Sequence, residues 1–193
     1  MKKVNLRNSK IFGLIGILLS FVGIILNIII EKITLAKTQV IYKISVPLLS
    51  LAAAIFLLIA FYEISKKTEA KEIFNNYLTA VLIAVVGSVF IIVVGVTFPI
   101  LIRDTTRLPE MIASTALTVS FITVVASSIF MSKAFRKTGE VLNNKYFIIA
   151  SRLILYGAYA LIIFVGVVLL FAGAIYEMLG FAHIPDEFVL TRR

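Results

Sequence analysis

The sequence predicts an all-α integral membrane bundle of five transmembrane helices. Three observations support this fold class. Of the 193 residues, 61% are hydrophobic and the mean hydropathy is +1.07, whereas a soluble domain is usually about half apolar. Five apolar runs are long enough to cross a bilayer, which takes about 20 residues. Basic residues cluster between the runs. We expect helices because a spanning segment must satisfy its own backbone hydrogen bonds.

The five runs form a single transmembrane domain over residues 1–193. The first four contain no Asp, Glu, Lys or Arg, and the fifth contains Arg152 as its one charge. The fifth run ends directly before Glu177, and residues 181–193 are expected to form a C-terminal tail. We predict the helices near residues 11–30, 44–62, 77–102, 111–131 and 147–176.

The first run also has features of a signal peptide. The segment "MKKVNLRNSK" is basic, and "TLA" before Lys37 offers a cleavage site. The apolar part of a signal peptide usually has 7–15 residues, and this run is longer. We therefore expect it to remain as the first transmembrane helix.

The distribution of Lys and Arg predicts the orientation of the chain. With five spans, eleven basic residues fall on the side of the N-terminus and seven on the side of the C-terminus. The positive-inside rule then predicts a cell-membrane protein with a cytoplasmic N-terminus and an extracytoplasmic C-terminus. The eleven are Lys2, Lys3, Arg7, Lys10, Lys66, Lys67, Lys71, Lys133, Arg136, Lys137 and Lys145, and the seven are Lys32, Lys37, Lys43, Arg103, Arg107, Arg192 and Arg193.

A regular stripe of small and polar residues runs through the first span. In "GLIGILLSFVGIILN" these residues are spaced by three, four, three and four, which places them on one face of a helix. Small residues let helix backbones approach closely in lipid, so we predict a helix-packing seam that leaves Ile17 and Leu18 outside. The seam consists of Gly13, Gly16, Ser20, Gly23 and Asn27.

The fourth run combines the same spacing with many hydroxyl side chains. Ala113, Ala116, Ser120, Thr123 and Ser127 repeat the pattern of the first run. Their hydroxyls could line a polar path through the membrane. The alternative is that they bond to carbonyls of their own helix or to neighbouring helices.

Two further polar residues inside the predicted spans invite a functional interpretation. Arg152 lies near the start of the fifth run, where a long side chain can reach the interface. We expect it to contact lipid head groups, although a charge inside a span can also mark a functional site. For Asn27, we expect a hydrated helix end, and the alternative is an interhelical polar contact or a ligand contact.

The composition argues against several kinds of chemistry. With no cysteine and one histidine, His183, the chain offers no thiolate metal site, iron–sulfur cluster or paired-histidine haem site. No Ser/His/Asp set, HExxH motif, P-loop or intramembrane carboxylate pair is present. We expect no enzymatic activity, no catalytic residue, no cofactor, no metal and no proton relay of carboxylates. The basic clusters between the runs do not form a nucleic-acid footprint, so no nucleic-acid partner is expected.

Two segments resemble a known family. "EIFNNYLTAVLIAVVG" at residues 72–87 and "KYFIIASRLILYGAYALIIFVGVVLLFAGAIYEMLGFAHIP" at residues 145–185 are similar to an archaeal multi-pass membrane family of unknown function. The similarity covers about two-thirds of the chain. It implies an archaeal membrane protein, and it assigns no activity and no functional residue.

These observations favour a non-enzymatic membrane protein, with the role of a structural or accessory subunit in a larger membrane complex. Its expected partners are membrane lipids and either other membrane proteins or further copies of the chain. The alternative is a small oligomeric transporter or channel that uses the hydroxyl-rich fourth helix. A polar, water-accessible cavity lined by that helix would favour the alternative.

Overall fold

The computed structural model describes residues 2–32, 36–101, 108–163 and 165–190, and most of them are helical. The chain begins with strand β1 and ends with strand β2, and the helices lie between these strands. The elements are β1 (Lys2–Asn5), α1 (Arg7–Lys32), α2 (Ala36–Thr68), α3 (Lys71–Leu101), α4 (Leu108–Leu142), α5 (Lys145–Tyr159), the 3₁₀ helix η1 (Ala160–Ile163), α6 (Val165–Ala182) and β2 (Glu187–Leu190).

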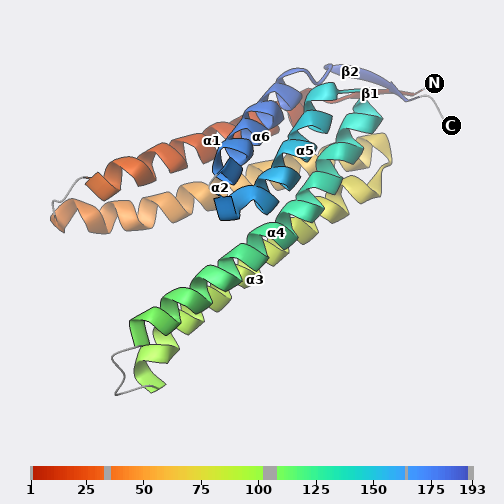
Figure 1. Cartoon of the computed structure of the whole chain (residues 1–193). Coiled ribbons are helices and arrows are strands. Elements are labelled where there is room, and N and C mark those ends of the chain that lie inside the picture. Colours follow the sequence, from red (N-terminus) through yellow and green to blue (C-terminus); the bar gives the residue numbers. More distant parts are fainter. Residues whose placement is uncertain (1, 33–35, 102–107, 164, 191–193) are drawn as a thin grey trace.

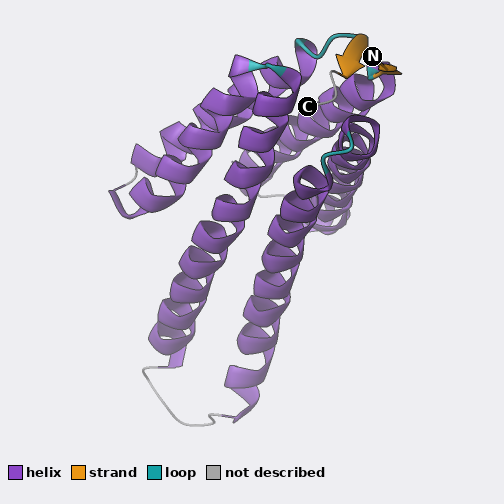
Figure 2. Ribbon diagram, turned by 90° about the vertical axis from the view of Figure 1, so that its right-hand side faces the viewer, coloured by secondary structure: helices purple, strands orange, loops and turns teal. Residues whose placement is uncertain are grey.

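The helices form three antiparallel hairpins, α1–α2, α3–α4 and α5–α6 (Figure 1). All three meet at the end of the molecule that carries both chain termini, and the two longer hairpins diverge away from it. Figure 2 shows α3 and α4 running side by side over their whole length. The shorter α5–α6 hairpin lies between the longer ones at the shared end.

The expected membrane architecture is confirmed for the described residues, where five helices are long and apolar enough to cross a bilayer. The first four of them correspond to the first four apolar runs of the sequence. The five candidate spans are Arg7–Asn27, Pro47–Thr68, Lys71–Val94, Glu110–Leu142 and Val165–Ala182.

The prediction of one fifth helix over residues 147–176 is wrong. The chain reverses at η1, and α6 runs back along α5 (Figure 1). A Cβ atom at Gly157 would lie 2.9 Å from the backbone nitrogen of Leu170, and one at Gly173 would lie 2.8 Å from the Ile154 side chain. Glycine therefore permits the close approach of the two helices. With 15 residues, α5 is about 22 Å long, short of the ~30 Å hydrocarbon core.

The two ends of the chain lie side by side. β1 and β2 form an antiparallel sheet in which Asn5 is opposite Glu187. Next to it, the Leu6 amide donates a 2.8 Å hydrogen bond to the Asp186 carbonyl. The reversal between α5 and α6 accounts for this pairing, because α6 runs back along α5 toward the N-terminal strand.

Five aromatic side chains join the hairpins at their shared end. Phe61 of α2 lies at the centre, with its ring centroid 4.2 Å from that of Tyr77, 5.5 Å from Phe135 and 5.4 Å from Phe181. Phe147 completes this aromatic cluster, and its ring is 5.0 Å from that of Phe181. Each of the five comes from a different helix, α2 to α6, and all five are buried. The core therefore fixes the hairpins at one end only.

Candidate functional site

A buried carboxyl group lies in α6, the last of the helices that are long and apolar enough to cross a membrane. Glu177 belongs to α6, five residues before its end at Ala182, which places it about 8 Å along the helix from that end. The residue is 8% exposed, and its Oε1 atom is buried without a hydrogen-bond partner among the described residues. Burying such an oxygen unpaired costs about 1–3 kcal/mol or more, so its retention needs an explanation.

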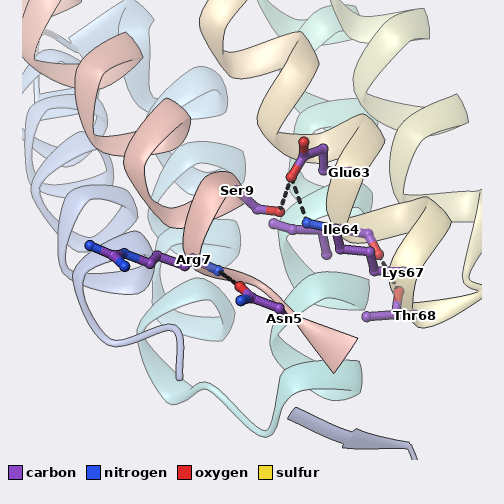
Figure 3. A network of polar contacts seen from close by, with 7 residues as sticks. All are labelled: Asn5, Arg7, Ser9, Glu63, Ile64, Lys67 and Thr68. Atoms are coloured by element: carbon purple, nitrogen blue, oxygen red, sulfur yellow. Dashed lines mark hydrogen bonds and ion pairs between the residues drawn. The ribbon is translucent and has the colours of Figure 1, made fainter. Parts of the chain in front are cut away.

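Two other carboxylates, Glu63 and Glu72, have cationic partners. Glu63 of α2 accepts hydrogen bonds from Ser9 Oγ at 3.1 Å and from Lys67 Nζ at 2.8 Å (Figure 3). Glu72 of α3 pairs with Lys137 of α4 at 3.1 Å. These contacts tie α1 to α2 and α3 to α4. Both carboxylates have a structural role, whereas the Oε1 atom of Glu177 has no hydrogen-bond partner among the described residues.

Glu177 lines a pocket of about 410 Å³ between the α3–α4 and α5–α6 hairpins. Each of α3, α4 and α6 contributes residues at helical spacing, so the pocket is built from one face of each helix. We call it the Glu177 pocket. Its lining consists of Ala84, Ser88 and Ile91 of α3, Ser120, Thr123, Val124, Ser127, Ser128 and Met131 of α4, Ile154 of α5, and Leu170, Ala174 and Glu177 of α6.

The hydroxyl groups of the pocket come mainly from α4. Ser120, Thr123 and Ser127, three residues of the predicted stripe on the fourth run, all line it. Ser88 of α3 donates to the Ala84 carbonyl at 2.8 Å, so its oxygen lone pairs remain as acceptors. Farther along α4, Thr118 donates to the Ser114 carbonyl and is exposed. The hydroxyls thus divide between lining the pocket and bonding to their own helix.

Close helix packing holds Glu177 toward the pocket. Gly173 and Gly180 flank it on the buried face of α6, and a Cβ atom at Gly180 would lie 3.0 Å from the Phe147 ring. Asn144, which caps the start of α5, donates from Nδ2 to the Gly180 carbonyl at 2.8 Å. Glu177 therefore lies on a fixed helix face, next to the aromatic cluster.

The predicted seam of the first run is buried over part of its length. Gly13 lies against the Phe181 ring of α6. A Cβ atom at Gly16 would lie 2.7 Å from Leu57 Cγ of α2, whereas one at Gly23 would be 3.7 Å or more from the side chains of Leu49 and Ser50. The packing of α1 is therefore tight near the shared end and looser farther along.

The remaining candidate residues lie apart from the Glu177 pocket. Ser20 is half-buried and donates to the Gly16 carbonyl at 3.1 Å, and the Asn27 side chain is exposed. The Arg152 side chain is exposed on α5, so contact with lipid head groups stays a prediction. Ile17, expected outside the seam, is 3% exposed, while Leu18 is 54% exposed. The buried face of α1 is therefore wider than the seam.

Sequence reasoning overlooked Glu177 because it counted apolar residues and ended the last run at Tyr176. One signal could have identified it. Glu177 lies four residues after Gly173 and three before Gly180, so it shares the helix face of two regularly spaced glycines. A carboxyl group in phase with a packing stripe points into the protein. Within the described residues, no group of three His, Cys, Asp or Glu side chains could hold a metal ion.

The hairpins and the pocket define a multi-pass helical membrane protein with a largely apolar pocket that also carries hydroxyl groups and one carboxyl group. The chain belongs to the family described as "Protein of unknown function (DUF996)", which matches residues 49–175. This match extends from α2 into α6 and ends two residues before Glu177. No match was found among curated proteins or solved structures. An archaeal source stays a prediction.

Proposed function

We propose that this chain is a transport protein that binds a small solute in the Glu177 pocket and is not itself an enzyme. The supporting observation is that Glu177 lines a pocket together with hydroxyl side chains of α3 and α4, while its Oε1 atom is buried and has no hydrogen-bond partner among the described residues. Ionisable groups inside membrane spans are costly and are commonly kept where they serve a function. The pocket also falls within the usual 300–1,000 Å³ range of ligand sites.

The arrangement of the hairpins supports movement of the solute as well as binding. The pocket lies between the α3–α4 and α5–α6 hairpins, which the aromatic cluster joins, and α3–α4 extends well beyond the shorter hairpin (Figure 1). A change in the angle between these hairpins alters the width of the pocket while the core stays packed. Many transporters carry their substrate sites between helix bundles that rock against each other.

For the orientation, we propose that both termini are cytoplasmic. Segments that bond to each other share one side of a membrane, so the pairing of β1 with β2 favours both chain ends on one side, in place of the expected opposite sides. Arg192 and Arg193 follow β2 in the sequence and lie outside the described residues. The basic asymmetry changes from eleven against seven to thirteen against five, and the positive-inside rule places the richer side in the cytoplasm. Reporter fusions after residues 10, 67, 137 and 193 should all read cytoplasmic. An external reading after residue 193 would contradict this orientation.

Solute-evoked currents in proteoliposomes test the transport proposal. Concentration jumps of inorganic cations, organic cations, organic anions and amino acids should give a current with at least one class. Ser127→Phe, which fills the pocket, should abolish that current. Leu117→Phe is the matched control on α4, because Leu117 is 75% exposed and does not line the pocket. Absence of current with every class, or equal currents in both variants, would overturn the proposal.

The role of an accessory subunit is a second candidate, and the exposed face of α4 favours it. Only 6% of the most apolar part of α4 is buried, and the small side chain of Ala113 is exposed. Small residues on an uncovered helix face allow a partner helix to pack closely. Purification in mild detergent followed by mass spectrometry tests this role. A stoichiometric second chain would support the subunit, and a pure homo-oligomer would contradict it.

A further inference from the structure

We propose that the Glu177 pocket binds a monovalent organic cation, an ammonium group carried on a small apolar body. This proposal rests on the Glu177 pocket being a solute site, and it adds the chemical class of the ligand. Three features of the lining carry it: one carboxyl group, several hydroxyl acceptors and an apolar wall.

The carboxyl group requires a positive partner that the pocket itself does not supply. No Lys, Arg or His is among the lining residues. Arg152, the cation of the neighbouring helix α5, is exposed. Tyr77 of α3, a titratable group that interacts electrostatically with Glu177, brings no positive charge. A carboxyl group in a low-dielectric site is neutralised by a proton or by a bound cation, and the size of this pocket leaves room for the cation.

The hydroxyl groups match a ligand rich in hydrogen-bond donors. An ammonium group carries up to three N–H donors and no acceptor. One donor can reach the Glu177 carboxylate, and the others can reach hydroxyl oxygens of α3 and α4, such as those of Ser88 and Ser127. The Ser88 hydroxyl hydrogen is already bonded to the Ala84 carbonyl. Its oxygen therefore serves as an acceptor, which suits a cation better than an anion.

The apolar lining of the pocket indicates that the rest of the ligand, apart from its ammonium group, is apolar. Ile91, Val124, Met131, Ile154 and Leu170 line the same pocket, and such side chains favour hydrocarbon over hydrated surface. A divalent metal is a poor match, because Ca²⁺ takes six to eight oxygen ligands, usually with several carboxylates, and this pocket has one carboxyl group. The volume of about 410 Å³ also exceeds the space that a bare ion fills.

Calorimetric titration of the full chain in nanodiscs tests the ligand class. The probes are benzylammonium, benzyl alcohol and benzoate, which share an aromatic body and differ in charge. Wild type should bind benzylammonium at least about tenfold more tightly than the other two, as a charge-assisted contact implies. Glu177→Gln should lose about tenfold or more in benzylammonium affinity, and Glu177→Asp should lose less. Glu110→Gln, at an exposed position of α4, is the matched control and should bind like wild type.

Three results would overturn the proposal: no binding of benzylammonium to wild type, equal affinity for the three probes, or unchanged affinity in Glu177→Gln. Thermal unfolding of each variant shows that the folded protein is being titrated. If Glu177→Gln fails to fold, Ser127→Phe provides the second test, and it should also lose benzylammonium binding. The outcome is separable from that of transport. Currents with anions alone would support transport and contradict an organic cation as the ligand. Binding of benzylammonium without any current would support the organic cation as the ligand and contradict transport.

Discussion

At the scale of single residues, Glu177 is the position where stability and function are expected to conflict. Replacement by Met keeps a long, flexible side chain and removes the unpaired carboxyl oxygen. We predict that Glu177→Met raises the free energy of unfolding by about 1–3 kcal/mol, the usual cost of an unsatisfied buried polar group. Thermal unfolding in one detergent measures the change. A variant less stable than wild type would mean that Glu177 has a stabilising partner.

The glycines of α1 provide a graded test of helix packing. Gly16→Ala places a Cβ atom 2.7 Å from Leu57 and 3.1 Å from the Ala53 carbonyl, so it should destabilise the protein by about 1–3 kcal/mol through overpacking. Gly23→Ala meets its nearest neighbours at 3.7 Å or more. This change should be neutral or stabilising by up to about 1 kcal/mol, because Ala is the better helix former.

Detergent or thermal unfolding measures both glycine variants. Leu18→Ile is the matched control on the exposed face of α1 and should leave stability nearly unchanged. If Gly16→Ala and Gly23→Ala have equal effects, the tight contact between α1 and α2 is not present in the membrane.

At this scale, the sequence predicts the face of a helix better than the distance to its neighbour. The spacing of Gly13, Gly16 and Gly23 gives their phase around the helix, and all three are buried. It cannot indicate that Gly16 meets a backbone carbonyl while Gly23 meets two flexible side chains. For the same reason it misplaces Ile17, which is buried against the core. Such distances depend on which helices pack together.

At the scale of elements, the first four spans were predictable and the last hairpin was not. Charged segments separate these four spans, so their ends can be recognised directly in the sequence. In contrast, the reversal between α5 and α6 passes through "YALIIFVG", a segment with no charged residue, Pro or Asn. Gly157, two residues before this segment, and Gly166, its last residue, were the signal for a reversal. At each of them a side chain would meet the backbone of the other helix.

The α5–α6 hairpin should be intolerant of side chains at Gly166. A Cβ atom there would meet the Gly157 carbonyl and the backbone of Ala160 and Leu161, and backbone atoms cannot move aside as side chains do. We predict that Gly166→Leu costs about 3 kcal/mol or more, at the upper end of overpacking, or prevents folding. Val168→Leu, at a 69% exposed position on the same helix, should change stability by less than about 0.5 kcal/mol. Similar unfolding temperatures for the two variants would contradict the hairpin.

At the scale of the whole molecule, the pairing of the two chain ends can be tested by cross-linking. The chain has no cysteine, so introduced cysteines have no competitors. Lys3 and Val189 are directly opposite in the sheet, and opposed residues lie about 4.5–5.5 Å apart, within disulfide range. We predict that Lys3→Cys with Val189→Cys forms an intramolecular disulfide when the purified protein is oxidised.

The control for this cross-link is Lys3→Cys with Glu187→Cys, a diagonal pair in the same sheet. Diagonal neighbours lie about 7–8 Å apart, too far for an unstrained disulfide, so this pair should form it much more slowly. Equal rates, or only intermolecular products, would mean that β1 and β2 are not paired.

The central proposal is that the Glu177 pocket admits a solute from water, and single-cysteine labelling tests it most directly. Ser127→Cys of the Glu177 pocket and Leu117→Cys of the exposed face of α4 are treated in native membranes with a charged, water-soluble thiol reagent. We predict that Ser127→Cys reacts and that Leu117→Cys, which faces lipid, does not. Failure of Ser127→Cys to react while the protein is folded, or equal reaction of both cysteines, would contradict the account.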